Sequence, residues 1–295
     1  MNKYIITTES TVDLSKEHLE NINVKYICFH YELNGVEYVD DLGETISSEA
    51  FYNKMVEGAT TKTSQVNAGE YKDFFTKYLD EGYDILHVSL SSGLSGSVNS
   101  ARIAIESLKE KYPNQKIYLV DSLAASSGFG LLVNTLAKLK DDGKTIEEVY
   151  EFAEENKLNV HHWFFTTTLT YFVRGGRVSA VSGFLGNILK ICPLLNVSNE
   201  GKLIPREKIR TKRKVIEAIV DKMVQFADNG VNYNGDCYMC HSNCIEDANT
   251  VKDLVEEKFP NLKGKVLINN IGTTIGSHTG PGTVALFFYG EKRVN

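Results

Sequence analysis

The chain has 295 residues, of which 42% are hydrophobic and 24% charged, and its formal net charge is -6. This length predicts two domains, and the acidic balance argues against a nucleic-acid-binding protein. The chain shows no apolar run of about 18 residues, no signal peptide and only five dispersed cysteines, so we expect a cytoplasmic protein without a transmembrane helix or disulfide framework.

The first half of the chain alternates between short strands and helices. Asn34-Gly35 favours a tight turn after the second strand, and Asn67 with Glu70 and Thr145 with Glu148 have the spacing of capping boxes. In chain order we expect strands at 3–8, 24–33, 83–90 and 115–122, and helices at 13–22, 47–55, 67–79, from about 97, 127–139 and 145–157. This alternation predicts a mainly parallel sheet flanked by helices on both faces.

The second half has a different rhythm. Residues 194–209 contain the turn Asn199-Glu200-Gly201 and indicate a hairpin. Further strands are expected at 161–168, 237–242, 265–272 and 284–290, and helices at 210–227 and 246–259. The sequence therefore predicts an α/β domain at 1–158 and an α+β domain with a largely antiparallel sheet at 159–295.

Three cysteines form the most conspicuous motif. Cys237, Cys240 and Cys244, with His241, include the CxxCH spacing of haem attachment and resemble a zinc knuckle. However, residues 236–241 alternate like a strand, which sends residues three apart to opposite faces. We therefore favour buried cysteines and expect no metal, although the sequence leaves a metal site open.

The serine- and glycine-rich loop at 89–97 leaves a predicted strand and opens a predicted helix. It lacks the GK[ST] ending of a phosphate loop, and around Ser95 it misses the spacing of a nucleophile elbow by one glycine. A purely structural turn is the plain alternative. Similar hydroxyl-rich segments recur at expected strand ends and in a late glycine-rich loop, at 7–11, 60–65, 121–122, 166–168 and 272–282.

Such segments meet at one edge of a parallel sheet, beside a helix N-terminus. Neutral donors without a lysine suit a single carboxylate. Two apolar stretches interspersed with small residues, 126–136 and 182–197, are interpreted either as core segments or as the wall of an elongated apolar pocket.

Six motifs in order resemble the DegV family, whose better-understood members are the fatty-acid-binding FakB proteins. They are ITTESTVDLS, KTSQVNAGEY, VSLSSGLSGSVNSARIA, VDSLAASSGFGLLV, FVRGGRVSAVSGFLG and IGSHTGPGTVALFF. The resemblance implies a two-domain α/β protein, not itself an enzyme, that holds one long-chain fatty acid with its carboxylate at the domain junction and needs no cofactor. It also implies a partner, the ATP-dependent kinase FakA, which phosphorylates the carboxylate, and at most transient membrane contact.

By this resemblance the carboxylate-binding groups fall on Thr63, Ser95, Gly96 and His278. Exposed arginines linked to kinase docking or phosphoryl transfer fall on Arg177 and Arg210, whose plain alternative is a solvated face. The chain departs from the family at Glu9, where an aspartate is usual, and in TSQVNAGEY, which lacks two prolines. The rival hypothesis is a serine esterase or acyltransferase that uses Ser95 and His278. Acyl chain length and oligomeric state stay open.

Overall fold

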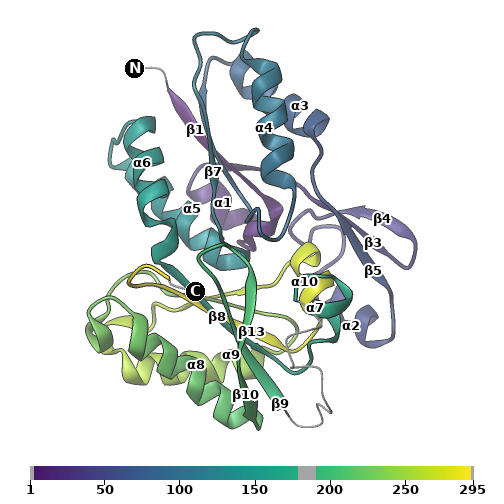
Figure 1. Cartoon of the computed structure of the whole chain (residues 1–295), viewed down its shortest axis with the longest axis vertical. Coiled ribbons are helices and arrows are strands. Elements are labelled where there is room, and N and C mark those ends of the chain that lie inside the picture. The colour runs from purple at the N-terminus through teal and green to yellow at the C-terminus, as the bar shows by residue number, and fades with distance from the viewer. Residues whose placement is uncertain (1–2, 179–190, 294–295) are drawn as a thin grey trace.

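The computed structural model describes residues 3–178 and 191–293. Its first sheet has the strand order β2-β1-β6-β7 and is parallel throughout. Its strands are β1 (Tyr4–Glu9), β2 (Val24–Ile27), β6 (Asp84–Ser89) and β7 (Ile117–Asp121). Its helices are α1 (Lys16–Asn21), α3 (Ala68–Asp80), α4 (Ser97–Leu108), α5 (Ser126–Asp141) and α6 (Ile146–Asn156). Helices α3 and α4 lie on one side of this sheet and α5 and α6 on the other (Figure 1). The predicted α/β architecture is confirmed, and so are both capping boxes.

The single strand predicted at 24–33 is wrong, because the chain leaves the parallel sheet after Ile27. There the backbone N–H of Phe29 donates to Ser10 Oγ at 3.0 Å, a tertiary contact that breaks the run. The chain continues into a separate antiparallel sheet of order β4-β3-β5. This sheet, absent from the prediction, contains β3 (His30–Leu33), β4 (Val36–Val39) and β5 (Thr61–Ser64), and α2 (Ser48–Val56) lies between β4 and β5 in the chain.

The six-stranded sheet of the second half has the order β10-β9-β8-β13-β11-β12 and is antiparallel except between β11 and β12. Its strands are β8 (Val160–Thr166), β9 (Ile191–Val197), β10 (Leu203–Arg210), β11 (Tyr238–His241), β12 (Leu267–Asn270) and β13 (Thr283–Tyr289). The β9–β10 hairpin is confirmed. The division of the chain near residue 158 stays a prediction, with which the start of β8 at Val160 agrees.

Side chains alternate between the two faces of this sheet, as the strand period of two requires. Trp163 and Leu286 pack with α8 (Lys212–Phe226) and α9 (Ile245–Lys258) in one core. Phe164 and Phe287 face the other way and belong to the larger core shared with the parallel sheet. The alternation therefore produces one face for helices and one face for the interior between the sheets.

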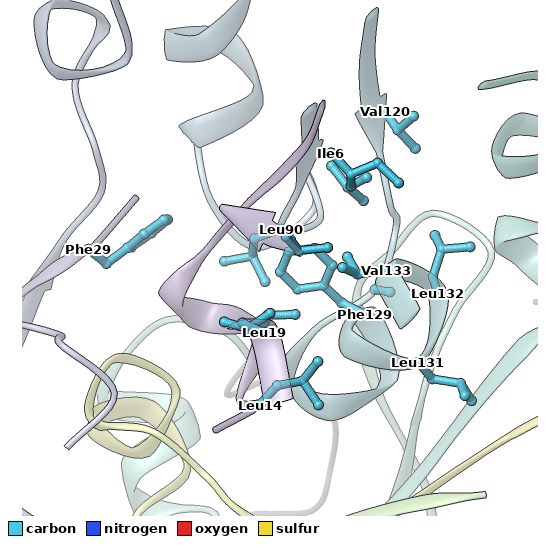
Figure 2. Close-up of a cluster of buried hydrophobic side chains, with 14 of the residues drawn as sticks. Ile6, Leu14, Leu19, Phe29, Leu90, Val120, Phe129, Leu131, Leu132 and Val133 are labelled. Atoms are coloured by element: carbon cyan, nitrogen blue, oxygen red, sulfur yellow. The ribbon is translucent and has the colours of Figure 1, made fainter. Parts of the chain in front are cut away.

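Helix α5 fills part of that interior and contacts strands of both sheets. Its Phe129 lies among Leu19, Leu90 and Val133 in the buried cluster of Figure 2. A Cβ at Gly128 would overlap the imidazole of His162, and one at Gly130 would come 2.8 Å from the carbonyl oxygen of Val12. The small residues of 126–136 thus allow close helix packing. This stretch is a core helix, and only its first residue, Ser126, lines a cavity.

Two short helices, α7 (Thr170–Arg174) and α10 (Thr273–Thr279), were not predicted. The glycine-rich segment around His278, interpreted as a loop, is helical up to Thr279 and turns only at Gly280, whose φ is 67°. Of the apolar stretch 182–197, residues 191–197 form β9 and the rest lies outside the described residues. Single 3₁₀ turns occur at Ser10–Val12, Lys157–Asn159, Gly230–Asn232 and Pro260–Leu262.

The cysteines of the CxxCH motif lie on opposite sides of the six-stranded sheet. Cys237 packs in the core under α8 and α9, whereas Cys240 packs in the core shared with the parallel sheet. Within 3–178 and 191–293, the structure contains no group of three His, Cys, Asp or Glu side chains placed to hold a metal ion. Over the same ranges, no helix has the length and apolar character needed to cross a membrane.

Candidate ligand-binding cavity

A cavity of about 540 Å³ lies between the two large sheets. Most of its wall is apolar and comes from strands and helices far apart in the sequence. The apolar residues are Phe29, Leu90, Leu94, Ala125, Phe164, Phe172, Val197, Leu203, Ile271, Ile275, Ala285 and Phe287. A cavity of this size and character accommodates a small, largely apolar molecule.

Polar side chains gather where β5, the 90–97 loop and α10 meet. Thr63, Gln65, Ser95 and His278 line the cavity there, together with the backbone of Gly96. Gly96 is exposed, whereas the apolar wall is mostly buried. The cavity therefore combines a polar end near the surface with an apolar interior, which matches an amphipathic ligand.

Thr63 and His278 form a direct pair at this end. The distance between Thr63 Oγ1 and His278 Nε2 is 2.8 Å. Burial, together with the positive charge of Arg177, lowers the pKa of His278 to about 4. The imidazole is therefore neutral near pH 7. In the tautomer with the proton on Nε2, the ring donates to Thr63, whose hydroxyl hydrogen then points elsewhere.

Gly175 determines how closely α7 approaches this histidine. A Cβ at Gly175 would overlap His278 Nδ1. That nitrogen is buried and has no hydrogen-bond partner among the described residues. Gly176 has a φ of 71°, a conformation that suits glycine. The two glycines of the RGGR motif therefore have different roles. Gly175 leaves room for His278, and Gly176 adopts a backbone conformation that suits glycine.

Ser95 is held by its own loop and by Gln65. Its Oγ donates to Gln65 Oε1 at 3.3 Å and accepts from the backbone N–H of Ser97 at 3.2 Å. Gln65 in turn donates to Ser100 Oγ at 2.9 Å. A Cβ at Gly96 would come 2.7 Å from Gln65 Oε1, so only glycine leaves this amide in place. Because α4 begins here, its N-terminal dipole adds positive potential.

Glu9 anchors the 89–97 loop from below. The carboxylate is fully buried and accepts from the hydroxyls of Tyr71 and Ser89 and from the backbone N–H of Leu90. Ser89 Oγ lies 3.2 Å from Ser97 Oγ. The strand end, α3 and the start of α4 are thereby joined through one carboxylate. Glutamate in place of the usual aspartate is fully integrated into this network.

The two candidate arginines have different surroundings. Arg177 was expected on an exposed face, but it is partly buried and lines the cavity. It donates from Nε to Leu94 O at 3.3 Å and from Nη1 to Gly175 O at 2.6 Å, and burial lowers its pKa. These bonds join α7 to the 90–97 loop. Arg210 is exposed at the end of β10 and is not part of the cavity wall.

The hydroxyl-rich segments converge only in part. Those at 60–65, 89–97 and 272–282 contribute to the cavity wall. Thr7, Thr11 and Ser122 are instead buried in hydrogen bonds within the first half of the chain. The segment 166–168 is also absent from the wall.

Gln65, His162, Gly175 and Cys240 line or support the wall but were not among the ligand-binding residues expected from the sequence. Gln65 lies inside the quoted KTSQ motif, and Gly175 lies inside RGGR, so both had a local signal. His162 lies in a strand that is mostly apolar, and Cys240 was expected to be a buried strand cysteine, with a metal ligand as the alternative. Their position on the wall follows from strand pairing, which the local pattern does not show.

The fold and the cavity define an α/β protein in which two sheets enclose an apolar chamber with a polar end. The DegV family model matches residues 3–291, and the chain belongs to this family. A DegV domain-containing protein of Clostridium perfringens is 39% identical over 294 residues, which cover 99% of both chains.

Solved structures of relatives have the same fold. A Thermotoga maritima protein described as revealing a fatty acid binding function is 28% identical, with 98% of this chain and 100% of that chain covered and a TM-score of 0.82. A Thermus thermophilus DegV family protein, described by its fatty acid binding, is 27% identical, with the same coverage and a TM-score of 0.85. A DegV lipid-binding protein of T. maritima is 29% identical, with 99% of both chains covered and a TM-score of 0.84.

Proposed function

We propose that this protein binds one long-chain fatty acid in the cavity, with the carboxylate at Thr63, Ser95, Gly96 and His278. The observation that carries the proposal is a mostly apolar chamber with hydroxyl, amide and imidazole groups at one end. The fatty acid binding described for the Thermotoga and Thermus relatives supports the same ligand class. The apolar wall holds the acyl chain by removing its surface from water.

The polar end is suited to a carboxylate without any cationic side chain in direct contact. Thr63 contributes a hydroxyl, and Ser95 contributes another when its proton turns from Gln65 Oε1 to the ligand. The start of α4 contributes backbone N–H groups and its dipole. Arg177 supplies positive charge nearby. This arrangement binds a single negative charge and leaves it reachable from the surface beside Gly96.

In this proposal the protein presents the bound acid to a separate kinase of the FakA type. The carboxylate oxygen attacks the γ-phosphorus of ATP, ADP leaves, and the acyl phosphate remains in the cavity. Arg177 beside the carboxylate stabilises the added charge, and exposed Arg210 contacts the kinase. Because the kinase supplies the ATP chemistry, we place the protein in the cytoplasm, with at most transient membrane contact and no cofactor of its own.

The rival hypothesis, a serine hydrolase, has weaker support. Ser95 Oγ donates to Gln65 and accepts from Ser97, whereas His278 Nε2 pairs with Thr63. A nucleophilic serine requires hydrogen-bond contact with its base and a third group that orients the base. Among the described residues, His278 Nδ1 has no such partner.

Native mass spectrometry of gently purified protein tests fatty-acid binding. We expect a bound species with the mass of one long-chain acid, or saturable uptake of palmitate and oleate by delipidated protein. Empty protein that also takes up neither acid would contradict the proposal.

The kinase step is tested by mixing the loaded protein with a FakA-type kinase and ATP and trapping acyl phosphate with hydroxylamine. Arg210→Ala should lower this transfer without changing acid affinity. An unchanged transfer rate would exclude Arg210 from kinase contact.

A further inference from the structure

Gln65 connects the end of β5 to the start of α4 at the polar end of the cavity. It follows β5 by one residue and Thr63 by two, and both side chains line the cavity. Its Oε1 accepts from Ser95 Oγ at 3.3 Å, and its Nε2 donates to Ser100 Oγ at 2.9 Å. The amide oxygen therefore holds the hydroxyl proton of Ser95, which a bound carboxylate also needs.

A carboxylate is incompatible with this orientation of the amide. Ser95 Oγ already accepts from the backbone N–H of Ser97 at 3.2 Å, so the hydroxyl has a single proton to donate. When that proton turns to a bound acid, Gln65 Oε1 loses its donor and faces the ligand. Two acceptors then meet, one of them charged, and neither is satisfied by the other. Binding of an acid therefore requires the Gln65 amide to move.

Half a turn of the amide about its terminal torsion removes this conflict. The torsion joins an sp³ and an sp² carbon and is broad and roughly two-fold, so the turned side chain keeps its shape. Nε2 then takes the position of Oε1 beside Ser95, and Oε1 faces Ser100. The Ser100 hydroxyl is compatible with both orientations, because a hydroxyl can accept from an N–H or donate to a carbonyl oxygen.

Gly96 leaves room for the turned amide. A Cβ at Gly96 would lie 2.7 Å from Oε1, 3.1 Å from Nε2 and 3.3 Å from Cδ of Gln65, so the amide packs against a residue without a side chain. After the turn, a hydroxyl donor of Ser95 and an N–H donor of Gln65 lie side by side, at the two positions that are now 3.3 Å apart. The two oxygens of one carboxylate can accept from both donors.

We infer that Gln65 is a specificity-determining residue, whose amide turns over when a fatty acid binds so that Nε2 donates to the carboxylate beside Ser95. The inference rests on the proposed fatty-acid binding and adds a contact to it. An ionised acid only accepts hydrogen bonds and makes full use of the turned amide. A fatty alcohol, whose hydroxyl also donates, binds with the amide in its present orientation.

Calorimetric titration of delipidated Gln65→Met with palmitate and with hexadecanol tests this inference. Methionine resembles glutamine in length but has no amide donor or acceptor. We expect palmitate to bind about fivefold more weakly, because the lost bond to a charged oxygen outweighs the neutral bond to Ser95 that the free protein also loses. The affinity for hexadecanol should change by less than about twofold.

Gln115→Met is the matched control. Gln115 donates from Nε2 to the carbonyl oxygen of Leu79 at 3.4 Å and is not part of the cavity wall. The same substitution there removes an amide of similar exposure without touching the polar end. Both affinities should therefore equal those of the native protein.

Two results with Gln65→Met would overturn the inference alone. Equal losses for palmitate and hexadecanol would make Gln65 a support of the 90–97 loop, and palmitate affinity that is unchanged or higher would mean that the amide does not contact the acid. If Gln65→Met does not fold, NMR of the native protein decides: the side-chain NH₂ signals of Gln65 should move downfield with palmitate but not with hexadecanol, and signals that stay in place would overturn the inference. Native protein that binds no palmitate would refute the proposed function, and this inference with it.

Discussion

Replacement of Thr63 by valine should weaken fatty-acid binding about 12- to 27-fold. Valine keeps the shape of threonine and the contacts of its methyl group but removes the hydroxyl that lies 2.8 Å from His278 Nε2. A hydrogen bond to a charged group contributes about 1.5–3 kcal/mol. Because Thr63 is only partly buried, we take the lower part of this range, about 1.5–2 kcal/mol, and about 1.4 kcal/mol corresponds to tenfold.

The double variant Thr63→Val/Ser95→Ala should lose about 100-fold or less. The two hydroxyls serve one carboxylate, so their contributions are not expected to add fully. The assay is calorimetric titration of delipidated protein with palmitate, at a pH where the acid is ionised and below its aggregation concentration.

Two controls isolate the carboxylate. Thr61→Val makes the same change on the same strand, but Thr61 donates to the carbonyl oxygen of Ser277 at 3.4 Å and is not part of the cavity wall, so affinity should stay within about twofold. Hexadecanol, which has no carboxylate, should bind Thr63→Val and native protein almost equally. The reasoning is refuted if Thr63→Val binds palmitate as tightly as native protein does, or if hexadecanol loses as much affinity as palmitate.

Three further outcomes are expected. Gly175→Ala should displace His278, weaken palmitate binding at least fivefold and destabilise the protein by about 1–3 kcal/mol through overpacking. In a His278→Ala background, Gly175→Ala should be nearly neutral. An equal loss of stability in both backgrounds would contradict this account. His278 is protonated below about pH 6.5 in the unfolded chain but only near its pKa of about 4 in the folded protein. Between these two pH values the free energy of unfolding should therefore fall by about 1.4 kcal/mol per pH unit because of this residue as the pH decreases. Denaturant titrations of His278→Gln should show a fall that is shallower by that amount, and parallel curves for the two proteins would disprove this effect of His278. Ala285→Leu should fill part of the chamber and shift the bound acids in native mass spectra toward shorter acyl chains. Val284→Ile, on the other face of β13, should leave the distribution of bound acids unchanged. If Ala285→Leu causes no shift, the acyl chain does not pass Ala285.

Local patterns predicted most of the regular elements, and long-range contacts explain most of the misses. The pattern at 24–33 indicates one continuous strand because most of its residues favour β-structure. The break depends on a contact with Ser10, which is distant in sequence. Helix α10 contains three threonines and a glycine among its seven residues, and both residue types are poor helix formers. It is held instead by tertiary bonds: Tyr52 donates to Ile271 O, and the Gly272 N–H donates to Asp13.

The polar end of the candidate site could be predicted only because several motifs together resemble those of the DegV family. Thr63, Ser95 and His278 lie on three segments whose local sequences suggest turns, and their meeting depends on how the small antiparallel sheet and α10 approach the 90–97 loop. Arg177 was expected on the surface because the family resemblance implies exposed arginines at this position, yet the carbonyl oxygens of Leu94 and Gly175 hold it inward. His162 carries no local signal, since its neighbour His161 has the same side chain but is not on the cavity wall.

The central claim concerns the position of a carboxylate, and a crystal structure of the protein with palmitic acid tests it most directly. The account predicts one acid in the chamber between the two sheets, with its carboxylate oxygens within hydrogen-bond distance of Thr63 and Ser95 and its chain running past Phe164 toward Phe287. A chamber that stays without the acid at saturating palmitate, or a chain with its carboxylate at the Phe287 end, would contradict it.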